Sequence, residues 1–182
     1  WVASLEYLLH FDIDKRNFTI VDVDEDGHKL QQYNRLLFCD SKKRIWAGGE
    51  MGISVFNQVG TSLLPNTDFQ IASVLKQAFV NCFYETSSGY LWIGTRNGLF
   101  ALKESDKQFL QYTTENGLPS NVIYGILEDA YGRLWISTNQ GLSCLNPESG
   151  KFRNFTIMDG LQGNQFNAGA YCRKDNGYML FG

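Results

Sequence analysis

The chain has few charged residues and no long run of one sign. Only 19% of its 182 residues are charged, and acidic and basic side chains nearly balance at a formal net charge of −3. The longest cationic run is Lys42-Lys43-Arg44, whereas sequence-independent phosphate binding needs clustered cations. Nucleic acid is therefore not expected as a partner of this chain.

Long hydrophobic runs are also missing. No stretch approaches the roughly 18 apolar residues that a membrane helix needs, and no signal peptide opens the chain. The chain begins at Trp1 rather than Met and ends at Gly182, each inside a predicted strand, so we interpret it as a fragment of a longer polypeptide. Membrane attachment is then expected only through a segment outside the fragment.

Cysteine is sparse. The four thiols are Cys39, Cys82, Cys144 and Cys172. They form no CxxC motif and have no histidine nearby, so a zinc site is not expected. Four cysteines are also too few for a disulfide scaffold in a chain of this length. We expect unpaired, half-buried thiols that lie in strands.

Signs of catalysis are few. The two histidines, His10 and His28, have no residue at a spacing that would indicate a catalytic pair. No nucleophile, zinc-protease, P-loop or dinucleotide motif occurs either. A carboxylate pair could serve hydrolysis, but Glu128 and Asp129 are explained by a turn that recurs along the chain. We predict no catalytic residue and no enzyme activity in this chain.

One string resembles a metal-binding loop. Asp22-Val23-Asp24-Glu25-Asp26-Gly27 satisfies the first positions of a calcium loop, in which oxygen ligands surround a sharp glycine turn. The closing glutamate should stand at the twelfth position, where this chain has Tyr33. We interpret the string as a solvated turn, with a weak calcium site as the alternative, so neither a metal nor a cofactor is expected.

Aromatic residues and glycine are abundant. Aromatics make up 14% of the chain, and there are 18 glycines but 3 prolines. A disordered chain would be poor in aromatics and rich in charge. This composition instead favours β structure with many tight turns.

An internal repeat decides the predicted fold. The segments IWAGGEMGISVF (45–56), LWIGTRNGLFAL (91–102) and LWISTNQGLSCL (134–145) share one template, and weaker copies begin at Trp1 and end at MLFG (179–182). The anchor position of the template falls on Trp1, Trp46, Trp92, Trp135 and Leu180, at intervals of 45, 46, 43 and 45 residues. Such a period is typical of stacked or radial repeat proteins.

Each repeat divides into four short strands. An apolar strand and a turn marked by residues such as Asp40, Gly89 or Asp129 precede the tryptophan strand. A tight turn ending in Gly98 or Gly141 follows it, and two further strands complete the unit. Four antiparallel strands per repeat predict an all-β chain of β-propeller blades, about four in number and forming part of a propeller over residues 1–182. A β-sandwich or an open β-solenoid is the alternative fold. The anchor tryptophans are expected to be structural, filling the gap where blades pack face to face.

The stretch ENGLPSNVIYGILEDAYGRLWISTNQGLSCLNPESGKFRNF (115–155) resembles the two-component regulator propeller repeat. The resemblance is clear at 80–103 and 35–57, loose at 1–30, and at 163–182 it is to the last blade of such sensors. It implies the periplasmic sensor region of a hybrid two-component system from polysaccharide-degrading gut bacteria.

Family resemblance further implies many blades in two propellers, then a β-sandwich, a membrane helix, a kinase and a DNA-binding output. It also implies detection of oligosaccharides by a sensor dimer. We expect the intact ring to be larger than this piece, because natural propellers usually need more blades.

The predicted ligand site lies on one face of the blades. In a propeller, the loop into the first strand and the loop between the second and third strands emerge together. We call this the loop face, and its predicted loops are 24–32, 47–52, 96–98, 113–121, 139–141 and 158–166. Amide and guanidinium groups bind sugar hydroxyls, and aromatic rings cover apolar sugar faces. The candidate ligand-binding residues are Arg96, Asn97, Asn121, Tyr124, Asn139, Gln140, Asn164, Gln165 and Asn167, with Phe166 just inside.

Three functions stay open at this point. The first is an extracytoplasmic sensor that binds an oligosaccharide and signals to a kinase outside the fragment. The second is a protein-interaction scaffold, which is the commoner use of propellers, and the third is a propeller enzyme. Fold alone cannot decide between them. On the loop face itself, asparagine and glycine are also the ordinary turn formers.

Overall fold

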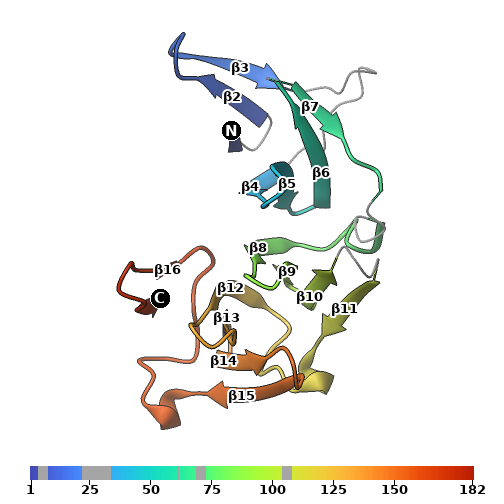
Figure 1. Ribbon diagram of the computed structural model, residues 1–182. Helices are drawn as coiled ribbons and strands as arrows, with labels where there is room; N and C mark the ends of the chain where they lie inside the picture. The colour runs from blue at the N-terminus through green and yellow to red at the C-terminus, as the bar shows by residue number, and fades with distance from the viewer. Residues whose placement is uncertain (4–7, 22–33, 61, 69–72, 104–107) are drawn as a thin grey trace. The chain divides into compact units, whose positions relative to one another are not determined.

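The computed structural model describes residues 1–3, 8–21, 34–60, 62–68, 73–103 and 108–182. It confirms the all-β fold, with antiparallel sheets whose strands follow one another in chain order (Figure 1). The calcium-like string 22–27, the loop 24–32 and His28 lie outside the described residues.

Three sheets are complete four-stranded blades. Blade A contains β4 (Asn34–Cys39), β5 (Arg44–Gly49), β6 (Gly52–Val59) and β7 (Ser62–Pro65). Blade B contains β8 (Val80–Glu85), β9 (Tyr90–Thr95), β10 (Gly98–Lys103) and β11 (Gln108–Tyr112). Blade C contains β12 (Ile123–Glu128), β13 (Leu134–Thr138), β14 (Gly141–Asn146) and β15 (Lys151–Phe155).

Two smaller sheets complete the described strands. One contains β1 (Val2–Ala3), β2 (Leu8–Asp12) and β3 (Asn17–Val21), and the other contains β16 (Tyr171–Arg173) and β17 (Met179–Phe181). Two short 3-10 turns, η2 (Thr114–Asn116) and η3 (Ile157–Asp159), precede and follow blade C.

The chain forms two compact units, Trp1–Val80 and Asn81–Gly182. The first holds the β1–β3 sheet and blade A, and the second holds nearly all of blade B together with blade C and the β16–β17 sheet. That residues 1–182 form one partial propeller stays a prediction, because it concerns how the two units are joined.

The tryptophan strands are apolar because both of their faces are covered. In β9 every residue after Tyr90 is buried, so this strand is a continuous apolar run rather than an alternating one. The turn after each such strand requires glycine. Gly141 has φ +110°, and a Cβ there would lie 2.3 Å from the carbonyl oxygen of Phe155. The hairpin can therefore close only when this position has no side chain.

Blades B and C share one hydrophobic core. Trp92, Leu99, Ile126 and Leu134 are among the fully buried residues that form it. A buried amide reinforces this contact, because Asn81 Nδ2 in β8 donates to the carbonyl oxygen of Ile123 in β12 at 2.8 Å. The first strands of the two blades are thus held side by side within the second unit (Figure 1).

The structural role of the anchor tryptophans is confirmed for two of them. Trp46 is 0% and Trp92 2% exposed. Trp135 is only half-buried and stacks on Phe155 of its own blade at 5.4 Å between ring centroids. The β16–β17 sheet, which follows blade C in the chain, has two strands, and Leu180 at the anchor position of that sheet is 46% exposed.

All four cysteines are free thiols, as predicted, but they are not half-buried. Cys82 and Cys144 are buried, whereas Cys39 and Cys172 are exposed. The difference follows from position: Cys82 lies in the core between blades B and C, and its burial raises the pKa of its thiol to about 12.

Candidate functional site

A carboxylate organises the turn before the tryptophan strand in blade C. Asp129 Oδ1 accepts from the backbone N–H groups of Tyr131 at 2.9 Å and Arg133 at 3.0 Å. Its Oδ2 accepts from Arg133 Nε at 2.7 Å and from Trp135 Nε1 at 3.0 Å. One side chain therefore closes the turn, pairs with the guanidinium and satisfies the indole.

Blade A repeats this arrangement at the corresponding residues. Asp40 Oδ1 accepts from the backbone N–H groups of Lys42 and Arg44 at 3.0 and 2.8 Å. Its Oδ2 accepts from Arg44 Nε at 2.6 Å and from Trp46 Nε1 at 2.8 Å. The aspartate, arginine and tryptophan thus form a recurring triad at this end of the blade.

In blade C the triad favours the ionised form of its carboxylate. Burial alone would raise the pKa of Asp129, but the hydrogen bonds from Trp135, Arg133 and Tyr131 outweigh that effect and hold the pKa below its usual value of 3.8. The same pairing raises the pKa of Arg133, chiefly through the hydrogen bond to Asp129.

Blade B departs from this pattern. Thr86 and Tyr90 stand where the other blades have aspartate and arginine, six and two residues before the tryptophan. Thr86 Oγ1 accepts from the backbone N–H of Tyr90 at 3.1 Å and so replaces the first carboxylate oxygen. A hydroxyl has no second oxygen, and Trp92 Nε1 has no hydrogen-bond partner although its side chain is buried. A buried donor left unpaired costs about 1–3 kcal/mol, so this exception needs a physical reason.

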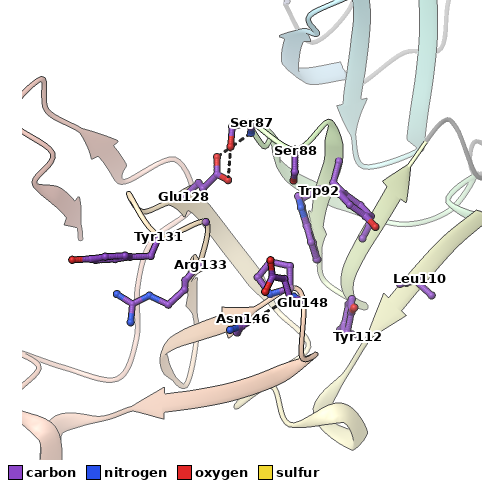
Figure 2. Close-up of a pocket in the computed structure, with 14 residues that line it drawn as sticks. Ser87, Ser88, Trp92, Leu110, Tyr112, Glu128, Tyr131, Arg133, Asn146 and Glu148 are labelled. Atoms are coloured by element: carbon purple, nitrogen blue, oxygen red, sulfur yellow. Dashed lines mark hydrogen bonds between the residues drawn. The ribbon is translucent and has the colours of Figure 1, made fainter.

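A pocket opens beside Trp92. It encloses about 390 Å³ and lies between blades B and C, and we call it the inter-blade pocket. Its walls come from β9 and the turn before it, from β10 and β11, from the end of β12 with the turn that follows, and from the end of β14 with its turn (Figure 2). The space therefore forms at the end of the blades where the triad stands in blades A and C.

Aromatic side chains form much of the wall. Trp92 stacks on Tyr112 with ring centroids 5.9 Å apart, and Tyr90 lies 6.1 Å from Trp92. Tyr131 lies at the rim, but it is 84% exposed and its ring points away from Trp92, with the guanidinium carbon of Arg133 5.2 Å from the ring centroid (Figure 2). Rings of this kind cover the apolar faces of ligands while their polar edges stay available.

Charged groups surround these rings. Glu128 was predicted to belong to a turn, but it is the last residue of β12 and is buried. Its carboxylate accepts from the backbone N–H and the hydroxyl of Ser87, each at 3.1 Å, and so connects blade C to blade B. Glu148 is exposed on the opposite wall. With Arg133 already paired to Asp129, the pocket has a negative balance of charge.

The sequence-predicted loop face is a second candidate site, and two of its asparagines have a structural role. Asn121 Oδ1 accepts from the backbone N–H of Thr114 at 2.8 Å, and Asn164 Oδ1 accepts from that of Ile157 at 2.9 Å. These equivalent bonds confirm that the two residues correspond between repeats. Each holds its loop in shape, and this leaves the Nδ2 groups as the donors for a ligand.

Several predicted loops do lie together. The backbone N–H of Gly98 donates to the carbonyl oxygen of Asn121 at 2.8 Å, and that of Gly141 donates to the carbonyl oxygen of Asn164. The turns 96–98 and 139–141 therefore contact the loops that lead into the next sheet. The predicted loop 47–52 is shorter in the structure, because residues 47–49 belong to β5.

Hydrogen bonds to threonine define how the two turns correspond. The backbone N–H of Asn97 donates to Thr95 Oγ1 at 2.9 Å, and that of Gln140 donates to Thr138 Oγ1 at 3.0 Å. Asn97 therefore corresponds to Gln140, and Arg96 corresponds to Asn139. The Oδ1 atom of Asn139 is buried without a hydrogen-bond partner.

Exposure divides the predicted loop-face residues. Arg96, Asn97, Gln140, Asn164, Gln165 and Asn167 are exposed, whereas Asn121, Tyr124 and Asn139 are half-buried. Phe166 does not face a ligand: it is 3% exposed and packs on Phe181, with ring centroids 6.4 Å apart. Ligand binding by the other nine stays a prediction.

The inter-blade pocket was missed by the sequence reasoning, although a signal for it was present. Segments 40–46 and 129–135 read DSKKRIW and DAYGRLW, whereas segment 86–92 reads TSSGYLW. Aligning the three repeats on tryptophan would have shown that one blade lacks the aspartate and the arginine. An indole without its acceptor could then have been predicted.

Within the described ranges, no group of three or more His, Cys, Asp or Glu side chains could hold a metal ion. The same part of the chain has no helix that is both long enough and apolar enough to cross a membrane.

Comparison with solved structures shows the fold. The extracellular domain of a protein named as a putative hybrid two component system, BT3049 from B. thetaiotaomicron, matches 90% of this chain at 24% identity with a TM-score of 0.74. That of BT4673 from the same organism matches 100% at 19% identity with a TM-score of 0.78. This chain covers 22% and 24% of those two chains, so it spans about a quarter of their length.

An enzyme shares the fold as well. A catalytically inactive histidine-to-alanine variant of virginiamycin B lyase from Staphylococcus aureus matches 80% of this chain and 47% of its own, at 18% identity with a TM-score of 0.56. No curated protein sequence matches the chain significantly. The sequence profile described as two component regulator propeller matches residues 75–97 and 117–140, which include the whole of the first two strands of blades B and C. These two segments are therefore similar to the two-component regulator propeller repeat.

Proposed function

We propose that this chain is part of the extracytoplasmic sensor region of a hybrid two-component system, located in the periplasm. In this role it binds an oligosaccharide and has no enzyme activity of its own. The signal passes to a kinase elsewhere in the same polypeptide, which acts as a homodimer.

The observation that carries this proposal is the position of the family repeats. They supply β9 and β13, the two tryptophan strands of the blades between which the inter-blade pocket lies. The structures of two-component extracellular domains that match this chain support the same assignment. Because these comparisons concern a propeller fold that hosts many functions, the function itself is argued from the site.

The chemistry of the exposed residues suits a sugar ligand. The loop face offers amide side chains, such as Asn97 and Gln140, and the inter-blade pocket offers aromatic rings beside polar groups. Sugars need both, because their hydroxyl groups form hydrogen bonds while their ring faces are apolar. A ligand transmits a signal only if it binds one arrangement of the sensor more tightly than another.

A protein-interaction scaffold is the second candidate, and an exposed apolar pair in the first unit favours it. Phe11 of β2 and Phe18 of β3 are 40% and 58% exposed, and their ring centroids lie 4.8 Å apart. Exposed apolar patches mark contacts with other proteins. Phe18→Ser would weaken such a contact and leave sugar binding unchanged.

The test is calorimetric titration of the 182-residue chain with a panel of oligosaccharides, followed by product analysis of each mixture. The proposal predicts saturable binding of one sugar class with no product formed. Cleavage of a bound sugar would indicate a propeller enzyme. Absence of binding across the panel would contradict the sensor proposal and favour the scaffold.

A further inference from the structure

We propose that the inter-blade pocket is a subsite for a neutral sugar residue, with Leu110 and Tyr112 as its apolar wall and the indole N–H of Trp92 as a hydrogen-bond donor. This inference rests on the proposed function, that the chain binds an oligosaccharide. It adds where the sugar lies and which sugars the pocket accepts.

The first argument is the indole without an acceptor. Trp46 and Trp135 donate to aspartates at 2.8 and 3.0 Å, whereas Trp92 Nε1 in the same repeat position has no partner. Trp92 is 2% exposed and lines the pocket. A hydroxyl group of a sugar is a suitable acceptor, because it can accept and donate at once. The missing oxygen of blade B is thus replaced by an oxygen of the ligand.

Access to this donor requires a small movement of one side chain. Less than 1 Å² of the nitrogen faces solvent, and Figure 2 shows the nitrogen-bearing edge of Trp92 beside Ser88. Ser88 is exposed, and its hydroxyl lies 3.0 Å from Thr86 Oγ1. Exposed side chains change rotamer within nanoseconds, so a ligand hydroxyl can displace that of Ser88 without disturbing the blade.

The second argument is the apolar wall that blade B contributes. Leu110 is 52% exposed and lines the pocket. Tyr112 lines the pocket as well and stacks on Trp92, with ring centroids 5.9 Å apart. Together these groups provide the apolar contacts for a sugar ring.

The third argument is charge, and it selects the class of sugar. Glu128 and Glu148 both line the pocket, and Arg133 is the cation among the described lining residues. Arg133 Nε is already paired with Asp129 at 2.7 Å. A carboxylate on the ligand would therefore meet two like charges and a guanidinium that is already neutralised. Neutral sugars should bind in preference to uronic acids.

The experiment compares variants of the 182-residue chain by calorimetric titration. The probes are hexasaccharides of glucan, xylan and mannan, with a galacturonan hexasaccharide as the acidic counterpart. Leu110→Ala should lower the affinity for the neutral sugar that binds by about three- to tenfold, because one apolar contact is lost. Leu180→Ala is the matched control: this leucine is 46% exposed, lies in β17 and does not line the pocket.

A second pair of variants tests the indole N–H itself. Trp92→Phe should lower the affinity by about three- to tenfold, because a hydrogen bond to the sugar is lost. Trp135→Phe removes the same atoms outside the pocket and should leave the affinity within about twofold. Because Leu110 is 52% exposed, Leu110→Ala should fold with a nearly unchanged Tm, so the proposal stays testable even if a tryptophan variant unfolds.

The outcomes separate the two proposals. If a sugar binds and neither Leu110→Ala nor Trp92→Phe weakens its binding, the pocket proposal is overturned while the proposed function stands. Preference for the galacturonan overturns the charge argument and with it the assignment to neutral sugars. If no hexasaccharide binds the unmodified chain, the proposed function fails, and the pocket inference fails with it.

Discussion

Giving blade B the two side chains that blades A and C carry should stabilise the chain. The double variant Thr86→Asp/Tyr90→Arg places a carboxylate and a guanidinium six and two residues before Trp92, as in the other two blades. The backbone is already suited to them, because Thr86 N donates to the carbonyl oxygen of Tyr90 at 2.9 Å, as Asp129 N does to that of Arg133.

The expected magnitude follows from the interactions that the two substitutions create and remove. The new carboxylate accepts from Trp92 Nε1 and from the new guanidinium, and hydrogen bonds to charged groups contribute about 1.5–3 kcal/mol each. Burying a carboxylate at a position that is 5% exposed offsets part of this stabilisation. Loss of the contact between the Tyr90 ring and Trp92 removes a further stabilisation of about 0.5–1.5 kcal/mol. We expect a net stabilisation of about 1–2 kcal/mol, or a rise in Tm of about 2–8 °C.

The assay is urea denaturation of the unmodified chain, both single variants and the double variant. Thr86→Asp alone should be neutral or destabilising, because its carboxylate is buried without a cation, and Tyr90→Arg alone should be destabilising. The coupling energy of the cycle should be about 1 kcal/mol or more in favour of the pair. A double variant no more stable than the unmodified chain, with no coupling, would refute the reasoning that Trp92 lacks only an acceptor.

Three other predictions concern single residues. The lowered pKa of Asp129 means that its ionised form stabilises the fold, so the unfolding free energy should fall as the pH drops below about 4. In Asp129→Asn this fall in the unfolding free energy should be smaller. Urea denaturation of both proteins at about pH 7 and at about pH 3 would measure the difference. Gly141→Ala should lower the unfolding free energy by more than about 1 kcal/mol, because the new Cβ meets a backbone oxygen. Gly132→Ala should lower it by less, because there is open space around Gly132. Urea denaturation of the two variants compares these losses. With its pKa raised to about 12, Cys82 should resist iodoacetamide in the folded chain while Cys172 reacts, and mass spectrometry of the peptides would reveal the opposite result.

Much of the fold could be predicted because the repeat encodes it locally. The tryptophan strands, the glycine turns and the strands after them depend on residues a few positions apart, and the two further strands predicted to complete each repeat are present in blade C as β14 and β15. Even the loop-face contact of Gly98 with Asn121 follows from blade topology alone. Such features need no knowledge of side-chain partners.

The candidate site depended on partners that no single repeat reveals. Glu128 was assigned to a turn because it precedes Asp129, yet its partner Ser87 lies 41 residues earlier in another blade. Asn164 was assigned to a ligand because amides bind sugars, yet its oxygen closes its own loop. The inter-blade pocket arises from a difference between repeats, whereas the sequence reasoning looked for what the repeats share.

The most direct test of the central claim is NMR spectroscopy of the four tryptophan indole N–H groups during titration with the neutral hexasaccharide that binds most tightly. Trp92→Phe and Trp135→Phe assign the two signals in question. The account predicts that the proton signal of Trp92 Nε1 moves downfield as a sugar oxygen accepts its hydrogen bond, while that of Trp135 stays in place. A stationary Trp92 signal, with shifts at the side-chain amides of Asn97 and Gln140 instead, would contradict the account and place the sugar on the loop face.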